Sequence, residues 1–193
     1  MNRWQQLFDK IALPYVDDPR RVSLPNQQTF DEFEERTSIT LPSSYCEFMS
    51  FFGPGEIAGE FRLLGPGYAN SNTDLESFNS WFQKGIRRSR TAEQFEDPDL
   101  AKRMIIFCLT FRGDYFSWDP EDVTDSSANE YSIHLLRHEM DATELIAHSF
   151  ADFVSNICLG DGYFEKYSLT GDRTLEGPRE VFEHALGKRR KKD

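Results

Sequence analysis

The chain has 193 residues, of which 33 are acidic and 22 are basic, giving a formal net charge of −11. This length suits one domain with a sizeable core, and 17 Phe, seven Tyr and three Trp argue against intrinsic disorder. Because no apolar run approaches the roughly 20 residues that span a bilayer and residues 1–18 lack the apolar segment of a signal peptide, we expect one cytoplasmic domain over residues 1–193.

The first forty residues predict two short helices with a loop between them. Residues 1–12 have apolar side chains three and four positions apart, as on one face of a helix. Residues 15–26 are expected to form a loop because prolines interrupt them. Thr29 and Glu32 match a capping box that would begin the second helix.

The strongest folding signal is LPSSYCEFMSFFGPG, residues 41–55. Pro42 suits the first position of a helix, and Gly53 followed by proline suits its end. We expect the start of this helix to depend on burial of Leu41 rather than on capping, because leucine is a poor N-cap. The buried stripe comprises Leu41, Tyr45, Phe48, Met49 and Phe52.

The middle of the chain alternates between strand and helix patterns. Residues 57–64 alternate apolar and polar side chains, as in a half-buried strand. Thr73 and Glu76 match a second capping box, before a helix whose apolar stripe is Leu75, Phe78, Phe82 and Ile86. Residues 104–111, MIIFCLTF, predict a central strand covered on both faces.

The rest of the chain predicts two more strands and two more helices. A turn at 112–114 leads to a strand at 115–119, and a polar loop over 119–130 precedes a strand at 131–137. Ser149 is expected to cap a helix that ends at Gly160, and residues 179–186 are expected to form a terminal helix. Together the segments predict an α+β fold, with helices covering a mainly antiparallel or mixed sheet.

The sequence offers no convincing active site, so we expect no catalytic residues, no cofactor and no metal. It contains no phosphate-binding loop, nucleophile elbow or zinc helix. The cysteines at 46, 108 and 158 are too far apart for a CxxC metal site, and Cys108 lies within an apolar strand that disfavours its thiolate. A metal site of His134, His138 and His148 is a conceivable alternative.

The negative charge is unevenly distributed. Residues 188–193 hold five basic side chains and one acidic side chain, which leaves 17 basic and 32 acidic residues, a net charge of −15, in the rest of the chain. Such a body repels nucleic acid and attracts basic partners. We therefore interpret the cations at 84–90 as charges that favour the end of a helix, and expect no direct binding of nucleic acid.

The order of the segments resembles the SUKH superfamily, which includes bacterial immunity proteins and fungal regulators of cell-wall synthesis. The resemblance covers about residues 28–157 and rests on FDEFEERTSI, on LP-x-x-Y-x-x-F from Leu41 to Phe48, on Gly113-Asp114 with Asp119, and on S-F-x-x-F from Ser149. The Asn-Gly-Gly often seen after the family's helix is here residues 52–55, and residues 93–99 and 160–193 have no clear counterpart.

The resemblance implies a protein-binding module without catalysis, most simply an immunity protein that blocks a basic toxin domain such as a nuclease. An intracellular regulatory or scaffold module is the alternative, and a small enzyme that uses His134 or Asp119 is a third. Because the family motif consists mostly of core residues, we place the expected partner contacts elsewhere. They are the acidic residues Asp119, Glu121, Asp122 and Asp125, with Tyr115 as an aromatic anchor.

Overall fold

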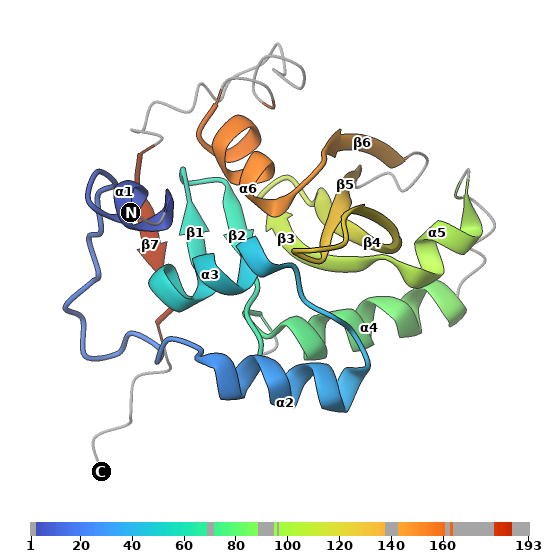
Figure 1. Ribbon diagram of the computed structural model, residues 1–193, viewed down its shortest axis with the longest axis horizontal. Coiled ribbons are helices and arrows are strands. Elements are labelled where there is room, and N and C mark those ends of the chain that lie inside the picture. Colours follow the sequence, from blue (N-terminus) through green and yellow to red (C-terminus); the bar gives the residue numbers. More distant parts are fainter. Residues whose placement is uncertain are drawn as a thin grey trace.

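The computed structural model describes residues 3–68, 72–88, 95, 97–137, 143–160, 163 and 180–186. In this part of the chain a seven-stranded sheet has helices on both faces (Figure 1). Its strand order is β6-β5-β4-β3-β2-β1-β7, and every neighbouring pair is antiparallel. The expected α+β class is confirmed.

Two of the strand predictions need correction. The single strand expected at 57–64 is a hairpin, because Ala58 and Gly59 both adopt positive φ and reverse the chain. The terminal helix expected at 179–186 is instead a strand paired with β1, in which Phe182 and His184 point to the core on alternate residues. The strands are β1 (Gly55–Ile57), β2 (Phe61–Leu63), β3 (Ile105–Thr110), β4 (Tyr115–Asp125), β5 (Glu130–Leu136), β6 (Thr143–Ala147) and β7 (Phe182–His184).

Ser149 is the N-cap of α6, as expected, whereas α2 and α4 begin one to three residues away from the expected caps. Asn26, rather than Thr29, is the N-cap of α2, and Thr29 is its capping-box partner. Asp74 accepts the Ser77 N–H at the start of α4, one residue after Thr73. The helices are α1 (Arg3–Phe8), α2 (Gln27–Thr37), α3 (Ser43–Phe52), α4 (Leu75–Arg88), α5 (Pro98–Arg103) and α6 (Phe150–Asp152), which continues as a π-helix over Phe153–Cys158.

The central strand β3 is covered on both faces, as expected. Phe107 belongs to the larger core, which also contains the buried side of α3. Ile106 belongs to a smaller core beneath α4 and α5. The Asn79 carboxamide fastens α4 to this strand by donating to Ile106 O and accepting from Ile106 N, both at 2.8 Å.

The start of α3 depends on a distant carboxylate as well as on burial. Leu41 is buried, as expected, but the N-cap Pro42 makes no side-chain hydrogen bond. Glu130, at the start of β5, accepts the Ser44 N–H at 2.9 Å and the Phe150 N–H at 3.2 Å. One buried carboxylate therefore caps both α3 and α6, which corrects the expectation that capping is unimportant here.

Candidate protein-binding surface

The acidic segment expected to be a loop is the outer half of strand β4, displaced from the sheet by a bulge. Trp118 pairs with Ile133, and the next pair is Val123 with Tyr131. Residues 119–122 therefore lie opposite Ser132 alone, so β4 carries three extra residues at this point. A bulge releases backbone from the ladder and redirects side chains, and bulges are frequent next to functional sites. We name residues 119–125 the acidic arm.

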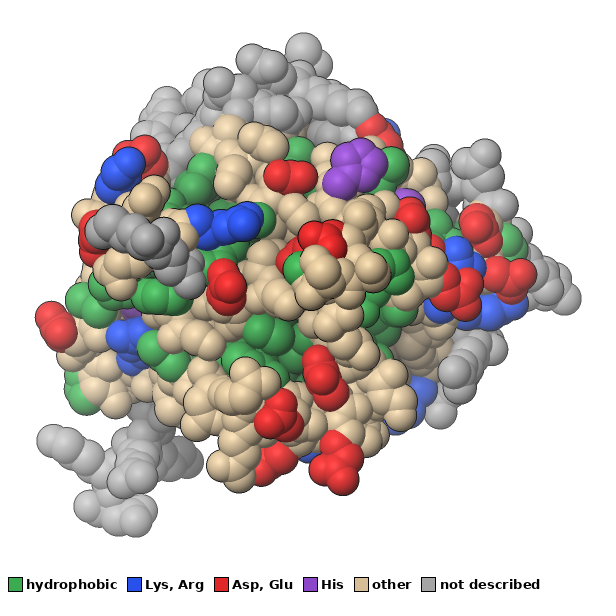
Figure 2. All heavy atoms as spheres, viewed as in Figure 1, with side chains coloured by type: hydrophobic (Ala, Val, Ile, Leu, Met, Phe, Trp, Pro, Cys, Tyr) green, Lys and Arg blue, Asp and Glu red, His purple; other side chains and the backbone are tan. Residues whose placement is uncertain are grey.

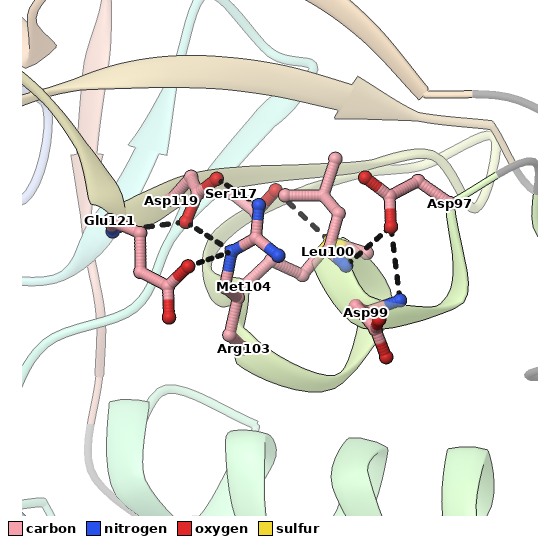
Figure 3. Close-up of polar contacts among 8 residues, drawn as sticks. All are labelled: Asp97, Asp99, Leu100, Arg103, Met104, Ser117, Asp119 and Glu121. Carbon is pink, nitrogen blue, oxygen red and sulfur yellow. Dashed lines mark hydrogen bonds and ion pairs between the residues drawn. The ribbon is translucent and has the colours of Figure 1, made fainter.

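Asp119 fixes the inner end of the acidic arm to helix α5. Its carboxylate accepts two hydrogen bonds from the Arg103 guanidinium, both at 2.8 Å, and one from the Glu121 N–H at 3.0 Å (Figure 3). Burial tends to raise the pKa of Asp119, but these hydrogen bonds outweigh it and hold the pKa below its ordinary value. Asp119 is only 4% exposed, so it positions the arm and presents little surface to a partner.

Glu121 and Asp122 are the acidic side chains that the bulge exposes. The Glu121 side chain is 75% exposed, with one ion-pair contact of 3.4 Å to Arg103. Asp122 is also exposed. Nearby, Asp97 and Asp99 begin α5, and the Asp97 carboxylate caps that helix by accepting the Asp99 and Leu100 N–H groups (Figure 3). The carboxylates of α5 and the arm therefore outnumber the cations Lys102 and Arg103.

The outer end of the acidic arm is held at two points. Thr124 donates its hydroxyl hydrogen to His148 O at 2.6 Å. Asp125 accepts from both the N–H and the hydroxyl of Ser127, at 2.9 and 2.6 Å, and these hydrogen bonds lower its pKa. The arm is thus anchored at both ends, with its exposed acids between the anchors. Such preorganisation reduces the ordering cost of binding.

Tyr115 lies at the opposite end of β4 and is half-buried. Its ring packs against Phe78 and Phe82 of α4, at centroid distances of 5.9 and 5.7 Å, and burial raises its pKa. An exposed aromatic side chain of α4 is Trp81, which is 63% exposed and packs on Phe78 at 5.4 Å. The sequence contained a signal for Trp81, because it is the large apolar residue that falls outside the apolar stripe of its helix.

The structure also bears on the alternative catalytic and metal sites. Burial lowers the pKa of His134, and it raises the pKa of Cys46 to about 12 and those of Cys108 and Cys158 well above the ordinary value. His138 lies outside the described residues. Among the described residues, no three His, Cys, Asp or Glu side chains are placed to hold a metal ion. Nor does that part of the chain include a helix long and apolar enough to cross a membrane.

Three comparisons with known proteins complete the description. Residues 24–156 match the model of the SMI1 / KNR4 family (SUKH-1). No curated protein matches the sequence. A solved structure titled "Crystal structure of protein from Pseudomonas syringae pv. tomato" is similar, with 17% sequence identity and a TM-score of 0.48, over 80% of this chain and 94% of that one.

Proposed function

The chain belongs to the SMI1 / KNR4 family (SUKH-1), and from that premise we propose that it is a non-catalytic immunity protein that neutralises a cognate toxin by direct contact. The observation that carries the proposal is the acidic arm, which is preorganised by Asp119 and presents Glu121 and Asp122 to solvent. The proposed partner is a basic toxin domain, for example a nuclease whose surface holds phosphates.

Charge supports this choice of partner. Without residues 188–193 the chain has a net charge of −15, and acidic side chains are widespread on the face shown in Figure 2. A protein with such a field attracts a basic partner and speeds its association. An acidic surface also competes with nucleic acid for the cations of a nuclease, so inhibition needs no chemical step.

Each of the five expected contact residues has a distinct part in the proposal. Glu121, Asp122 and Asp125 face the partner directly. Asp119 holds the arm through Arg103, and Tyr115 supports the aromatic side chains of α4. We add Trp81 as the aromatic anchor, because tryptophan and tyrosine are enriched among the residues that contribute most to binding energy at protein interfaces. Trp81 is more exposed than Tyr115.

Protection in the cell is the test of this function. The chain is co-expressed with the toxin-like open reading frames that flank its gene, and growth is compared with cells that carry the toxin alone. Rescue of growth, together with co-purification of the two proteins, is the expected result. Absence of any toxin-like neighbour and of any rescue would contradict the immunity role.

A regulatory or scaffold module in the cytoplasm is the second candidate, because the same family includes regulators of cell-wall synthesis. It predicts that the purified chain captures kinases or cell-wall factors and that it does not protect cells from a toxin. One affinity purification from the native cell therefore discriminates between the two roles.

A further inference from the structure

Residues 180–186, which contain β7, hold the first part of the chain against the sheet, and we name them the clasp. On one side β7 pairs with β1 (Figure 1). On the other side the Phe182 N–H donates to Ala12 O at 2.9 Å, and the Val22 N–H donates to Ala185 O at 3.1 Å. The clasp is thus a strand inserted between the first part of the chain and the rest of the sheet.

One imidazole fixes the centre of the clasp to the core. His184 is only 3% exposed, and its Nδ1 atom lies 2.8 Å from Phe52 O at the end of α3. Because a carbonyl oxygen only accepts, Nδ1 must carry the hydrogen of the neutral ring. The other ring nitrogen, Nε2, is buried and has no hydrogen-bond partner among the described residues. Protonation of Nε2 would bury a charged N–H group without an acceptor, which is costly.

The surroundings of His184 also oppose its protonation. Burial lowers the pKa of His184 and the positive charge of Arg21 lowers it further, while the hydrogen bond from Nδ1 acts in the opposite direction. Asp17, in the same segment as Arg21, acts on that guanidinium. Glu183 and its cross-strand partner Glu56 point to the opposite face of the sheet, because side chains alternate along a strand. The carboxylates of these two strands are thus directed away from the imidazole.

We propose that the clasp is a pH-sensitive latch, which releases residues 12–22 and 180–186 when His184 is protonated, while the rest of the sheet stays folded. In the closed state the ring is neutral. In the open state water hydrates the ring, which then titrates with an ordinary pKa of about 6.5. The closed state is therefore fully favoured above that pH and loses free energy as the pH falls below it. The latch does not depend on the identity of any partner.

Opening should expose an apolar surface without unfolding the core of the family. Phe182 of the clasp packs on Phe48 and Phe52 of α3, at centroid distances of 5.8 and 5.1 Å. Both the clasp and residues 12–22 lie outside residues 24–156, which match the family model. The aromatic side of α3 would be uncovered, so a dye that binds apolar surface, anilinonaphthalene sulfonate, should fluoresce more strongly at pH 5.5 than at pH 7.5.

Amide hydrogen exchange of the purified protein tests the latch. Protection factors, which correct for the effect of pH on intrinsic exchange, are compared at pH 7.5 and pH 5.5 for the amides of Ala12, Val22, Phe182 and Ala185. We expect them to fall about tenfold, because pH 5.5 is one unit below the pKa of an exposed histidine. The Leu64 amide, bonded to Phe107 O within the sheet, should stay better protected at both pH values.

Two outcomes of the exchange experiment would overturn the proposal. Unchanged protection of the clasp would mean that His184 does not control its opening. Equal protection of the clasp and Leu64 at pH 5.5 would mean that the chain opens as one unit, so that no separate latch exists.

Three variants isolate the imidazole. His184→Asn keeps an NH₂ group that can donate to Phe52 O but carries no charge at either pH, so the fall in clasp protection should disappear. His148→Asn, at an exposed histidine, should retain the tenfold fall. His134→Asn should retain it too, although burial also lowers the pKa of His134. A fall that persists in His184→Asn would contradict the proposal.

A direct titration covers the case in which His184→Asn leaves the clasp unprotected at both pH values. The ring protons of His184 are followed by NMR in the wild-type protein from pH 8 to pH 4.5. We expect a folded pKa below 6.5, with the clasp amides losing protection as the pH falls below 6.5. A folded pKa of 6.5 or above would overturn the proposal, because protonation would then not favour opening.

Discussion

The two halves of strand β4 show how one strand can serve both stability and binding. Residues 115–118 pair one for one with β5, and Phe116 and Trp118 are fully buried. At the bulge the register shifts, so that beyond it Val123 pairs with Tyr131 and Asp125 with Glu130, and every residue from 121 to 127 is exposed. Asp119 lies at the boundary, buried and paired with Arg103. Substitutions in the inner half should therefore change stability, and substitutions in the outer half should change binding.

The largest loss of stability is expected from the inner half. Trp118→Ala removes a ring that stacks on Phe107 at 5.0 Å and contacts Tyr45 at 5.3 Å. It should lower the free energy of unfolding by about 3–5 kcal/mol, as for other large core truncations. Denaturant unfolding followed by circular dichroism measures the change. Trp118→Phe retains a ring and should cost less than half as much; equal losses would show that stacking on Phe107 contributes little.

Glu130, just after the acidic arm, should have the next largest effect. Glu130→Ala leaves the Ser44 and Phe150 N–H groups without their acceptor, at a cost of about 2–3 kcal/mol of unfolding free energy. Glu130→Gln keeps one acceptor oxygen and should fall between the wild type and the alanine variant. Glu121→Ala is the exposed control. If Glu130→Ala proved as mild as this control, the shared cap would be unimportant.

Helices and strands with a strong local pattern were predictable from the sequence. The stripe of α3 and the apolar run of β3 each depend on residues within one segment, and both elements are confirmed. The hydrogen bond from Ser44 to Glu130 links residues 86 positions apart. No local pattern reports such a contact. The three-residue strand β7 is likewise defined by its pairing with β1, since three residues are too few to show a period.

The candidate site was predictable in composition but not in geometry. The sequence identified the acidic residues of the arm, but it gave no indication that Arg103, 16 residues from Asp119, would bury that carboxylate in an ion pair. The bulge that exposes Glu121 also arises from pairing with β5. Burial and strand register are tertiary properties. The sequence alone therefore does not show which acidic side chains are exposed and available to bind a partner.

Asp119→Asn tests the boundary between the two halves. It should cost about 1–2 kcal/mol of unfolding free energy at pH 7, because hydrogen bonds between charged groups are lost. The pKa of Asp119 is depressed in the folded protein, so its stabilisation is complete above the unfolded pKa of about 3.9 and disappears as the pH falls through the folded value. The difference in unfolding free energy between the wild type and Asp119→Asn should therefore shrink as the pH is lowered from 7 to 3. Asp122→Asn, which removes the same charge at an exposed site, is the control.

The outer half should respond in binding while its stability hardly changes. The double variant Glu121→Lys/Asp122→Lys reverses two exposed charges, so its unfolding free energy should stay within about 0.5 kcal/mol of the wild type. Its affinity for the co-purified partner should fall about 10- to 100-fold at low salt, mainly through slower association, and less at high salt because salt screens exposed charges. Surface plasmon resonance at two salt concentrations measures both rates.

Net charge alone could produce part of that loss, so the control reverses two charges on another surface. Glu35→Lys/Glu47→Lys changes the net charge by the same amount, on exposed positions of α2 and α3. If binding depends on the acidic arm, this variant should retain most of its affinity. An equal loss of affinity in both variants would mean that binding depends on the net charge of the molecule and not on the acidic arm. The outer half of β4 would then be exposed without being a binding site, and the contrast between the two halves would concern stability only.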